Sequence, residues 1–297
     1  MHSLTGPIAQ RFIARSNAYA VQKGFGGYVP AREKDLPDGT HGPDLRLTGS
    51  LIDQHIAGEI TLGHYMLSPK GKAKLFALDI DLRDAHGKWI PTPSAADFEA
   101  VEKRFAGDPQ GLEEAVAHLR NPVGGNPREL WQDKKHPSRP FFLRQMKGVA
   151  DAFAHRIWDE FNGEIPVACA YSGFKGIHVY GFTGLADAAD VRALGQAVIE
   201  SFDRYRPQKG GNFWLDGDDN PETGFRNFEI ELFPKQDATR EDGYGNLMRL
   251  PLGINKKAPK SKGFFVDQRP GVANIKPLGE ADTLRLLETG DPWGESW

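Results

Sequence analysis

Residues 170–180 read AYSGFKGIHVY, and this stretch gives the strongest indication of how the chain folds. Successive side chains of a β-strand point to opposite faces, so the apolar residues of IHVY would face one side and His178 and Tyr180 the other. The glycines that precede them permit a tight turn. We therefore predict a strand over residues 165–171, a turn over 172–175 and a strand over 176–182.

Two further stretches show the same alternation, and both carry acids. FALDID ends in Asp79 and Asp81, and FEIELFPKQ contains Glu229 and Glu231. In each stretch the acids would share one face of the strand, opposite the apolar residues. If the three strands belong to one sheet, a carboxylate-rich surface lies beside a cluster of serine, lysine and histidine. An ordinary polar strand face is the alternative.

Paired carboxylates on one strand suggest a metal. Two acids two residues apart raise each other's pKa unless a cation lies between them. Mg²⁺ and Mn²⁺ prefer such oxygen ligands, and a third carboxylate on a neighbouring strand would supply enough of them for two ions. The turn at 172–175 adds glycine N–H groups and the ammonium of Lys175, which suit a phosphate. The pattern predicts a metal-dependent nucleotide site, and a purely structural turn is the alternative.

Length and composition describe an ordinary globular protein. The chain has 297 residues, of which 39% are hydrophobic and 26% charged, enough for one large catalytic unit or two smaller domains. No apolar run approaches the roughly 20 residues that cross a bilayer. The single cysteine, Cys169, excludes an internal disulfide and a multi-cysteine zinc site, and it fits a reducing cytoplasm.

Charge is unevenly distributed along the chain. The net charge of −3 argues against a protein that coats nucleic acid by bulk electrostatics, but residues 134–150 and 243–266 each contain five lysines or arginines and no acid. Only the groove itself must be positive to hold a phosphate backbone. The two basic segments therefore suit a nucleic-acid channel, and a pair of solvated basic loops is the alternative.

The remaining segments predict a mixed architecture. Strands and helices alternate irregularly, which favours an α+β fold over a regular parallel one. We expect a small mixed module over residues 1–65, polar helices over 94–120 with a break near 107–109, a loop over 121–140, amphipathic helices over 146–161 and 191–205, a loop over 210–224, strands over 226–233 and 247–252, and a short helix over 281–287.

Several common catalytic patterns are missing from the sequence. It has no GxxxxGK[ST] P-loop, and the glycine-rich stretch at residues 23–27 lacks the strand–helix context of a phosphate loop, so it predicts a plain turn. Ser172 is not within a GxSxG nucleophile elbow. The histidines do not have the spacing of metal ligands. These patterns argue against a P-loop motor, a serine hydrolase and a zinc enzyme.

Taken in order, the motifs resemble those of the archaeo-eukaryotic primase superfamily, in particular the primase-polymerases of plasmids, phages and prokaryotic defence islands. The hhhDhD motif of that family corresponds to residues 75–81, the SGxKGxHVY motif to 172–180, the EhFPKQ motif to 231–236 and the GxGNhhxLPLG stretch to 243–253. One such motif is weak evidence, whereas four in the same order are specific.

The resemblance implies a DNA primase-polymerase, a template-dependent nucleotidyltransferase that initiates or extends strands from NTPs or dNTPs with two Mg²⁺ or Mn²⁺ ions. It implies that Asp79, Asp81 and Glu231, rather than Glu229, are the catalytic metal ligands. Tyr65 lies where related enzymes have a tyrosine that senses the nucleotide sugar, and a core tyrosine is the alternative. The implied contacts to the nucleotide are Ser172, Lys175, His178, Asn246, Arg249 and Lys256.

The resemblance also implies the fold and the domain organisation. The family has an RRM-like antiparallel sheet packed with helices, together with an N-terminal αβ module. We therefore expect one catalytic unit over residues 1–297, made of an N-terminal part over 1–65, a motif-bearing core over 66–270 and a tail over 271–297 that leads to a further domain in a longer protein. The zinc-binding insertion of some family members is absent, which puts primer-free initiation in doubt.

The implied partners follow from this function. We expect a single-stranded or primed DNA template, a helicase or other replication partner, no membrane, and a cytoplasmic location, in a host cell if the protein is encoded by a phage or plasmid. Two other functions remain open. A two-metal nuclease would share the acids, and a noncatalytic nucleic-acid-binding replication module would need stacking aromatics where this sequence has carboxylates.

Overall fold

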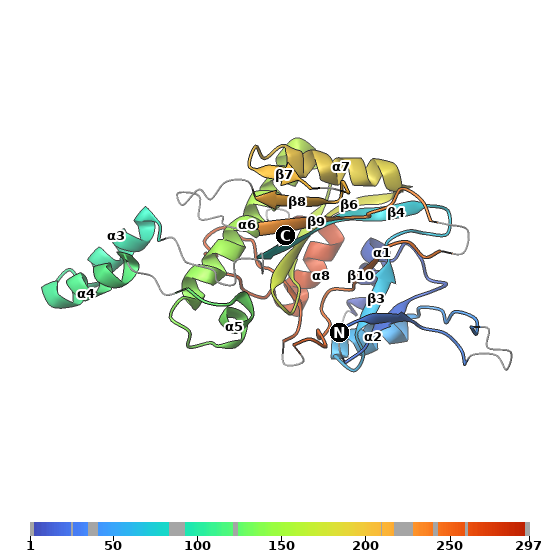
Figure 1. The fold of residues 1–297 in the computed structure, drawn as a ribbon, viewed down its shortest axis with the longest axis horizontal. Helices are drawn as coiled ribbons and strands as arrows, with labels where there is room; N and C mark the ends of the chain where they lie inside the picture. The colour runs from blue at the N-terminus through green and yellow to red at the C-terminus, as the bar shows by residue number, and fades with distance from the viewer. Residues whose placement is uncertain are drawn as a thin grey trace.

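Two antiparallel sheets form the body of the protein, and helices α3 (Ala95–Arg104) and α4 (Pro109–Arg120) extend from it (Figure 1). None of the described helices is long and apolar enough to cross a membrane. The computed structural model describes residues 3–24, 26–34, 41–82, 93–120, 124–208, 210–216, 228–239, 243–258 and 261–294.

The larger sheet places the three motif-bearing strands side by side. In the described part of the chain it has seven strands in the order β11-β5-β6-β4-β9-β8-β7, and every pairing is antiparallel. The FALDID strand, β4, lies between the IHVY strand, β6, and the FEIELF strand, β9. The strands are β4 (Lys72–Leu82), β5 (Val167–Tyr171), β6 (Gly176–Asp187), β7 (Tyr205–Pro207), β8 (Phe213–Asp216), β9 (Phe228–Phe233) and β11 (Phe264–Phe265).

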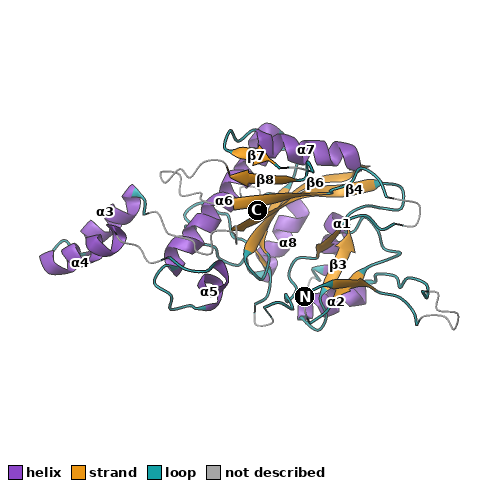
Figure 2. Cartoon of the chain, viewed as in Figure 1, coloured by secondary structure: helices purple, strands orange, loops and turns teal. Residues whose placement is uncertain are grey.

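Two long helices connect the central strands and cover one face of the sheet. From β4 the chain reaches β5 through several helices, the last of which is α6 (Arg139–Glu160), and from β6 it reaches β9 through α7 (Ala188–Glu200), β7 and β8. Each helix thus joins two parallel strands that have a third strand between them, a split β-α-β arrangement. Figure 2 shows α7 along one side of the sheet and α1 (Thr5–Phe12), α2 (Gly49–Ala57) and β3 (Leu62–Tyr65) on the opposite side. The predicted α+β class is confirmed, and its description as RRM-like stays a prediction.

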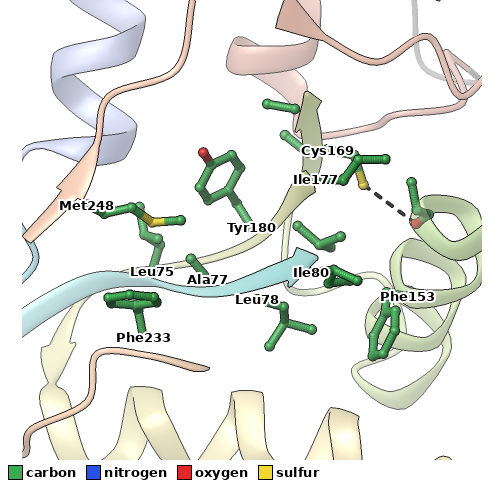
Figure 3. Close-up of a cluster of buried hydrophobic side chains, with 14 of the residues drawn as sticks. Leu75, Ala77, Leu78, Ile80, Phe153, Cys169, Ile177, Tyr180, Phe233 and Met248 are labelled. Atoms are coloured by element: carbon green, nitrogen blue, oxygen red, sulfur yellow. Dashed lines mark hydrogen bonds between the residues drawn. The ribbon is translucent and has the colours of Figure 1, made fainter. Parts of the chain in front are cut away.

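The core lies between this sheet and the two helices. Figure 3 shows the buried cluster in which Leu78 and Ile80 of β4 lie with Ile177 of β6 and Phe153 of α6. The helix α7 approaches the sheet closely at Gly195, where a Cβ atom would come within 2.5 Å of Leu232. The apolar face of β4 is thus sealed by helices, which leaves the acids to the other face.

The smaller sheet combines the N-terminal module with a strand from the far end of the chain. Its order is β10-β3-β1-β2, again antiparallel throughout. The aromatic ring of Phe12 packs edge-on against Tyr180 of the large sheet, with 4.9 Å between centroids. The elements of this module are α1 (Thr5–Phe12), β1 (Ala20–Gln22), β2 (Tyr28–Pro30), α2 (Gly49–Ala57), β3 (Leu62–Tyr65) and β10 (Leu247–Arg249).

Several element predictions need correction. The predicted loop over 121–140 contains a helix, α5 (Pro127–Gln132), and the start of α6, where Pro140 in the first turn has no N–H to leave unsatisfied. The helix expected to continue to Tyr205 ends at Glu200. The predicted loop over 210–224 contains β8, and its residues 217–224 lie outside the described part. The break between α3 and α4, and the helix near the C-terminus, α8 (Glu280–Thr289), are confirmed.

Candidate active site

The register of the large sheet aligns the acidic side chains in two rows. Asp79 lies directly opposite His178 of β6 and Glu231 of β9. In the next row, Asp81 lies opposite Glu229. Directly opposite residues on neighbouring strands point to the same face, so the carboxylates share a surface with the histidine. The predicted common face therefore exists.

A cavity of about 380 Å³ opens over this face. Its walls come from both sheets, and we call it the carboxylate cavity. Six of the predicted site residues line it: Asp79, Asp81, Ser172, Lys175, His178 and Arg249. Sequence reasoning missed four further polar residues of the wall: Gln22, Tyr28, Asn255 and Lys257.

Asp79 contacts His178, and the hydroxyl of Tyr180 on the other side of the imidazole ring holds that ring in place. His178 Nε2 lies 3.3 Å from Asp79 Oδ1, and His178 Nδ1 lies 2.9 Å from the hydroxyl of Tyr180. Burial raises the pKa of the Tyr180 phenol, so this hydroxyl stays protonated, and its contact with Nδ1 holds the imidazole with Nε2 toward Asp79. Burial opposes ionisation of Asp79, but the charges of His178, Arg249 and Lys175 hold the pKa of its carboxyl below the ordinary value.

Asp81 experiences the opposite shift. Burial and the negative charge of Asp79 raise the pKa of Asp81 to about 7, with a smaller contribution from Glu229, although Lys175 opposes the rise. Lys175 Nζ lies 3.1 Å from Asp81 Oδ2 and 4.0 Å from Glu229 Oε1. Even with this lysine present, a proton competes for the Asp81 carboxylate near neutral pH. The two aspartates therefore favour a further cation.

The glycines around the 172–175 turn make room for this arrangement. A Cβ atom at Gly176 would overlap Asp81 Oδ1. Gly173 has a φ of +76°, in the left-handed region that favours glycine. The Gly176 N–H donates to the hydroxyl oxygen of Ser172 at 3.2 Å, which closes the turn. The spacing of the motif thus has a steric cause as well as a chemical one.

Arg249 connects the two sheets at the cavity. It lies on β10, opposite Gly63 of β3, and its guanidinium donates to the backbone carbonyl of Ser172. The contact fixes the 172–175 turn against the smaller sheet. A guanidinium has five donors in a fixed fork, so Arg249 can also bind phosphate oxygens.

Two predicted residues, Glu231 and Asn246, lie beside the carboxylate cavity rather than in its wall. Both are held by Lys235 of the EhFPKQ motif. The Lys235 ammonium pairs with the Glu231 carboxylate, and the Lys235 N–H donates to Asn246 Oδ1 at 2.6 Å. The third and fourth motifs are therefore joined to each other through this lysine.

The cavity wall near residues 255–257 contains Lys257 rather than the predicted Lys256. The side chain of Lys257 passes over Gly26, in the turn between β1 and β2, and a Cβ atom there would overlap it. Gln22 Nε2 donates to Asn255 Oδ1 at 3.2 Å, and Gln22 Oε1 accepts the Lys256 N–H at 2.8 Å. The sequence does not indicate this role of Gln22, because a glutamine in a short strand looks like any polar surface residue.

Tyr65 and Tyr28 differ in their position relative to the cavity. Tyr65 does not line the cavity, because its ring stacks on Tyr244 with 4.6 Å between centroids, and burial raises its pKa to about 12. Tyr28 does line the cavity, and its buried hydroxyl makes no hydrogen bond of ordinary geometry to the described residues. The role of Tyr65 in sugar recognition stays a prediction, and Tyr28 becomes a second candidate.

The donor set of the cavity fits a hard divalent cation. Asp79 and Asp81 offer carboxylate oxygens on one strand face, and Mg²⁺ is commonly held by one or two carboxylates together with substrate phosphates. In the part of the chain that the structure describes, no three acidic, histidine or cysteine side chains converge as a complete metal cage. Binding shared with substrate phosphates does not require such a cage.

An antiparallel α+β fold with paired aspartates beside an SGxKGxH turn is the arrangement expected of a primase-type domain. Residues 132–275 match the family described as TOTE conflict system, Archaeo-Eukaryotic Primase domain. The match confirms the superfamily that the motifs indicated and gives this segment a primase-like nucleotidyltransferase character at the level of the family. The matched segment includes the 172–175 turn, whereas Asp79 and Asp81 precede it. A search of curated proteins finds no match.

Proposed function

We propose that this protein is a template-dependent nucleotidyltransferase, a DNA primase-polymerase that joins NTPs or dNTPs to the 3′ end of a strand. One observation carries the proposal: Asp79 and Asp81 face one cavity together with Lys175 and His178. A nucleoside triphosphate with its metal ions needs carboxylates that bind the cations and basic side chains that bind the phosphates. The family match over residues 132–275 supports the same chemistry.

The carboxylates would bind Mg²⁺ or Mn²⁺. Asp79 and Asp81 would be ligands from the cavity wall, and Glu231, opposite Asp79 in the register, would be the third. Such ions, when bound, lower the pKa of an attacking 3′-hydroxyl and neutralise charge on the reacting phosphate and the leaving pyrophosphate. The raised pKa of Asp81 supports this role, because burial and the neighbouring Asp79 carboxylate make its negative charge unfavourable unless a cation binds there.

The basic side chains would position the triphosphate. In the structure, Lys175 contacts Asp81 and His178 contacts Asp79. If divalent cations neutralise these carboxylates, Lys175 and His178 could bind phosphate oxygens instead. Arg249, on the small sheet, adds a guanidinium to the cavity wall. Positioning and charge stabilisation provide most of the acceleration in phosphoryl transfer.

An incorporation assay tests this proposal. The protein is incubated with a single-stranded template, labelled nucleotides and Mg²⁺ or Mn²⁺, with and without a primer. We expect labelled product from the wild type and at least about 100-fold less from Asp79→Asn, because a cation ligand is lost. Asp190→Asn, which removes an exposed carboxylate of α7, is the matched control and should retain activity.

The outcomes separate the possible functions. Product without a primer identifies a primase, and product only with a primer identifies a polymerase that extends existing ends. Degradation of the template without incorporation would indicate a two-metal nuclease, and binding with neither reaction a noncatalytic module. Full incorporation by Asp79→Asn would refute the assignment of the carboxylates.

A further inference from the structure

A second cavity, of about 810 Å³, lies beside the carboxylate cavity. We call it the basic cavity, because none of the described residues that line it is acidic. The two basic segments of the sequence, 134–150 and 243–266, meet here although they are far apart in the chain. Its basic side chains are Lys134, Arg139, Lys257 and Lys262.

One wall of the basic cavity is aromatic. Trp131 stacks on Tyr171 with 3.9 Å between ring centroids, and Phe264 lies 5.1 Å from Tyr171 on β5. Phe264 is only half-buried and lines the cavity, so part of its ring is available for contact. An aromatic ring in a positively charged groove is the usual platform on which unpaired bases stack.

Two hydrogen-bond donors at this wall lack an acceptor within the described structure. Trp131 is 9% exposed, and its Nε1 has no partner. The Nε of Arg139 is also buried without one. A buried donor without an acceptor is unfavourable, and a ligand with acceptor atoms in the cavity would satisfy both donors. Phosphate and base oxygens are such acceptors.

The basic cavity is next to the carboxylate cavity. Both are lined by Lys257. The hydroxyl of Tyr171 donates to the backbone carbonyl of Phe174 at 3.2 Å and lies 3.1 Å from Ser261 Oγ, so one short segment separates the two hollows. A strand lying in the basic cavity would therefore reach the aspartates at one end.

We propose that the basic cavity binds single-stranded nucleic acid, with phosphates on Lys134 and Arg139 and a base stacked on Phe264. The inference rests on the proposed function in one respect, since both place nucleic acid at the same active centre. It adds the location and the mode of binding: charge provides affinity for the backbone, and the aromatic wall provides affinity for unpaired bases.

Fluorescence anisotropy with a labelled single-stranded oligonucleotide, in DNA and RNA forms, tests the charge contribution. The measurement is made without nucleotide or metal, over a range of salt. Lys134→Ala/Arg139→Ala should weaken binding and reduce the slope of log Kd against log salt by about 1.4, or about 0.7 per lost phosphate contact. The control Lys103→Ala/Arg104→Ala removes two exposed charges from α3 and should change neither quantity.

Phe264→Leu tests the stacking contribution. It keeps an apolar side chain in β11 but removes the ring, and its thermal unfolding is compared with that of the wild type to confirm folding. We expect binding to weaken between about fivefold and 150-fold with the salt slope unchanged. Wild-type affinity in this variant would overturn the stacking mode and leave a general polyanion site. Failure of the wild type to bind either oligonucleotide would overturn the whole proposal, as would wild-type affinity in the Lys134→Ala/Arg139→Ala variant.

A parallel measurement separates this inference from the proposed function. Metal-dependent binding of a nucleoside triphosphate reports on the carboxylate cavity alone. Retained triphosphate binding by a variant that has lost oligonucleotide binding supports the basic cavity as a distinct site. Equal loss of both in every variant would contradict it, because it would indicate general disruption of the protein.

Discussion

Asp81 couples the chemistry of the site to the stability of the protein. Its folded-state pKa of about 7 lies above the ordinary carboxyl value of about 3.9, so the native state favours the protonated form. The stability from this effect is fully present below pH 4 and is lost as the pH rises through 7. We expect Asp81→Asn to be more stable than the wild type at pH 8 by roughly 1 to 4 kcal/mol, because the buried charge is removed.

Urea unfolding from pH 4 to pH 8, without divalent metal, measures this difference. The stability gain of Asp81→Asn should shrink toward pH 4, where the wild-type carboxyl is protonated in the folded state and no buried charge remains to be removed. Incorporation activity should be lost at every pH. A variant that is no more stable than the wild type at pH 8 would show that Lys175 already neutralises Asp81 fully.

The identity of the third carboxylate is a separate prediction. The motif and the register opposite Asp79 favour Glu231, whereas Glu229 lies opposite Asp81 and both of these carboxylates lie near Lys175. We expect Glu231→Gln to reduce incorporation about 100-fold and to raise the metal concentration required, while Glu229→Gln stays within about fivefold of the wild type. Metal titrations of both variants measure this, and the reverse order of effects would assign the ligand role to Glu229.

At the scale of single elements, the close contact between α7 and the sheet depends on Gly195, which has no side chain. A Cβ atom at Gly195 would lie 2.5 Å from Leu232 and 3.1 Å from Phe76. Glycine to alanine in a helix normally stabilises it by up to about 1 kcal/mol, but overpacking a core costs about 1 to 3 kcal/mol. We therefore expect Gly195→Ala to lower the free energy of unfolding by roughly 1 to 2 kcal/mol.

Chemical denaturation of Gly195→Ala and of a control tests this packing. The control is Gly49→Ala, at the start of α2, where the added Cβ would meet Thr5 at an ordinary 3.4 Å. It should be neutral or slightly stabilising. Stabilisation by both substitutions would mean that α7 can move away from the sheet without loss.

The strands that carry the motifs could be predicted because their evidence is local. In the motif segments of β4, β6 and β9 the polar residues fall on alternate positions. The sequence of each strand therefore indicates which side chains share a face, even when the neighbouring strands are unknown. The short strand β8 pairs only with β7 and β9, and nothing in its own four residues distinguishes it from a loop. The helix α5 was missed for a similar reason, since six residues are too few to show a helical period.

At the scale of the whole molecule, the site forms where two sheets meet. The acids, Lys175 and His178 come from the large sheet, whereas Arg249 and Tyr28 come from the small one. The first group could be predicted because each member stands in a motif with its own chemical logic. Tyr28 could not, because it lies on β2 and its place at the cavity depends on the whole order β10-β3-β1-β2 of the small sheet, which joins segments far apart in the chain.

Binding of a non-hydrolysable nucleoside triphosphate, measured by calorimetry with and without Mg²⁺, tests most directly whether the carboxylate cavity is a metal-dependent nucleotide site. The wild type and Asp190→Asn should bind the triphosphate much more tightly with Mg²⁺ than without it. Asp79→Asn/Asp81→Asn should lose that dependence, because its remaining contacts are those of the basic side chains alone. Binding by this double variant that is as tight as that of the wild type in Mg²⁺, and that weakens when Mg²⁺ is removed, would contradict the account.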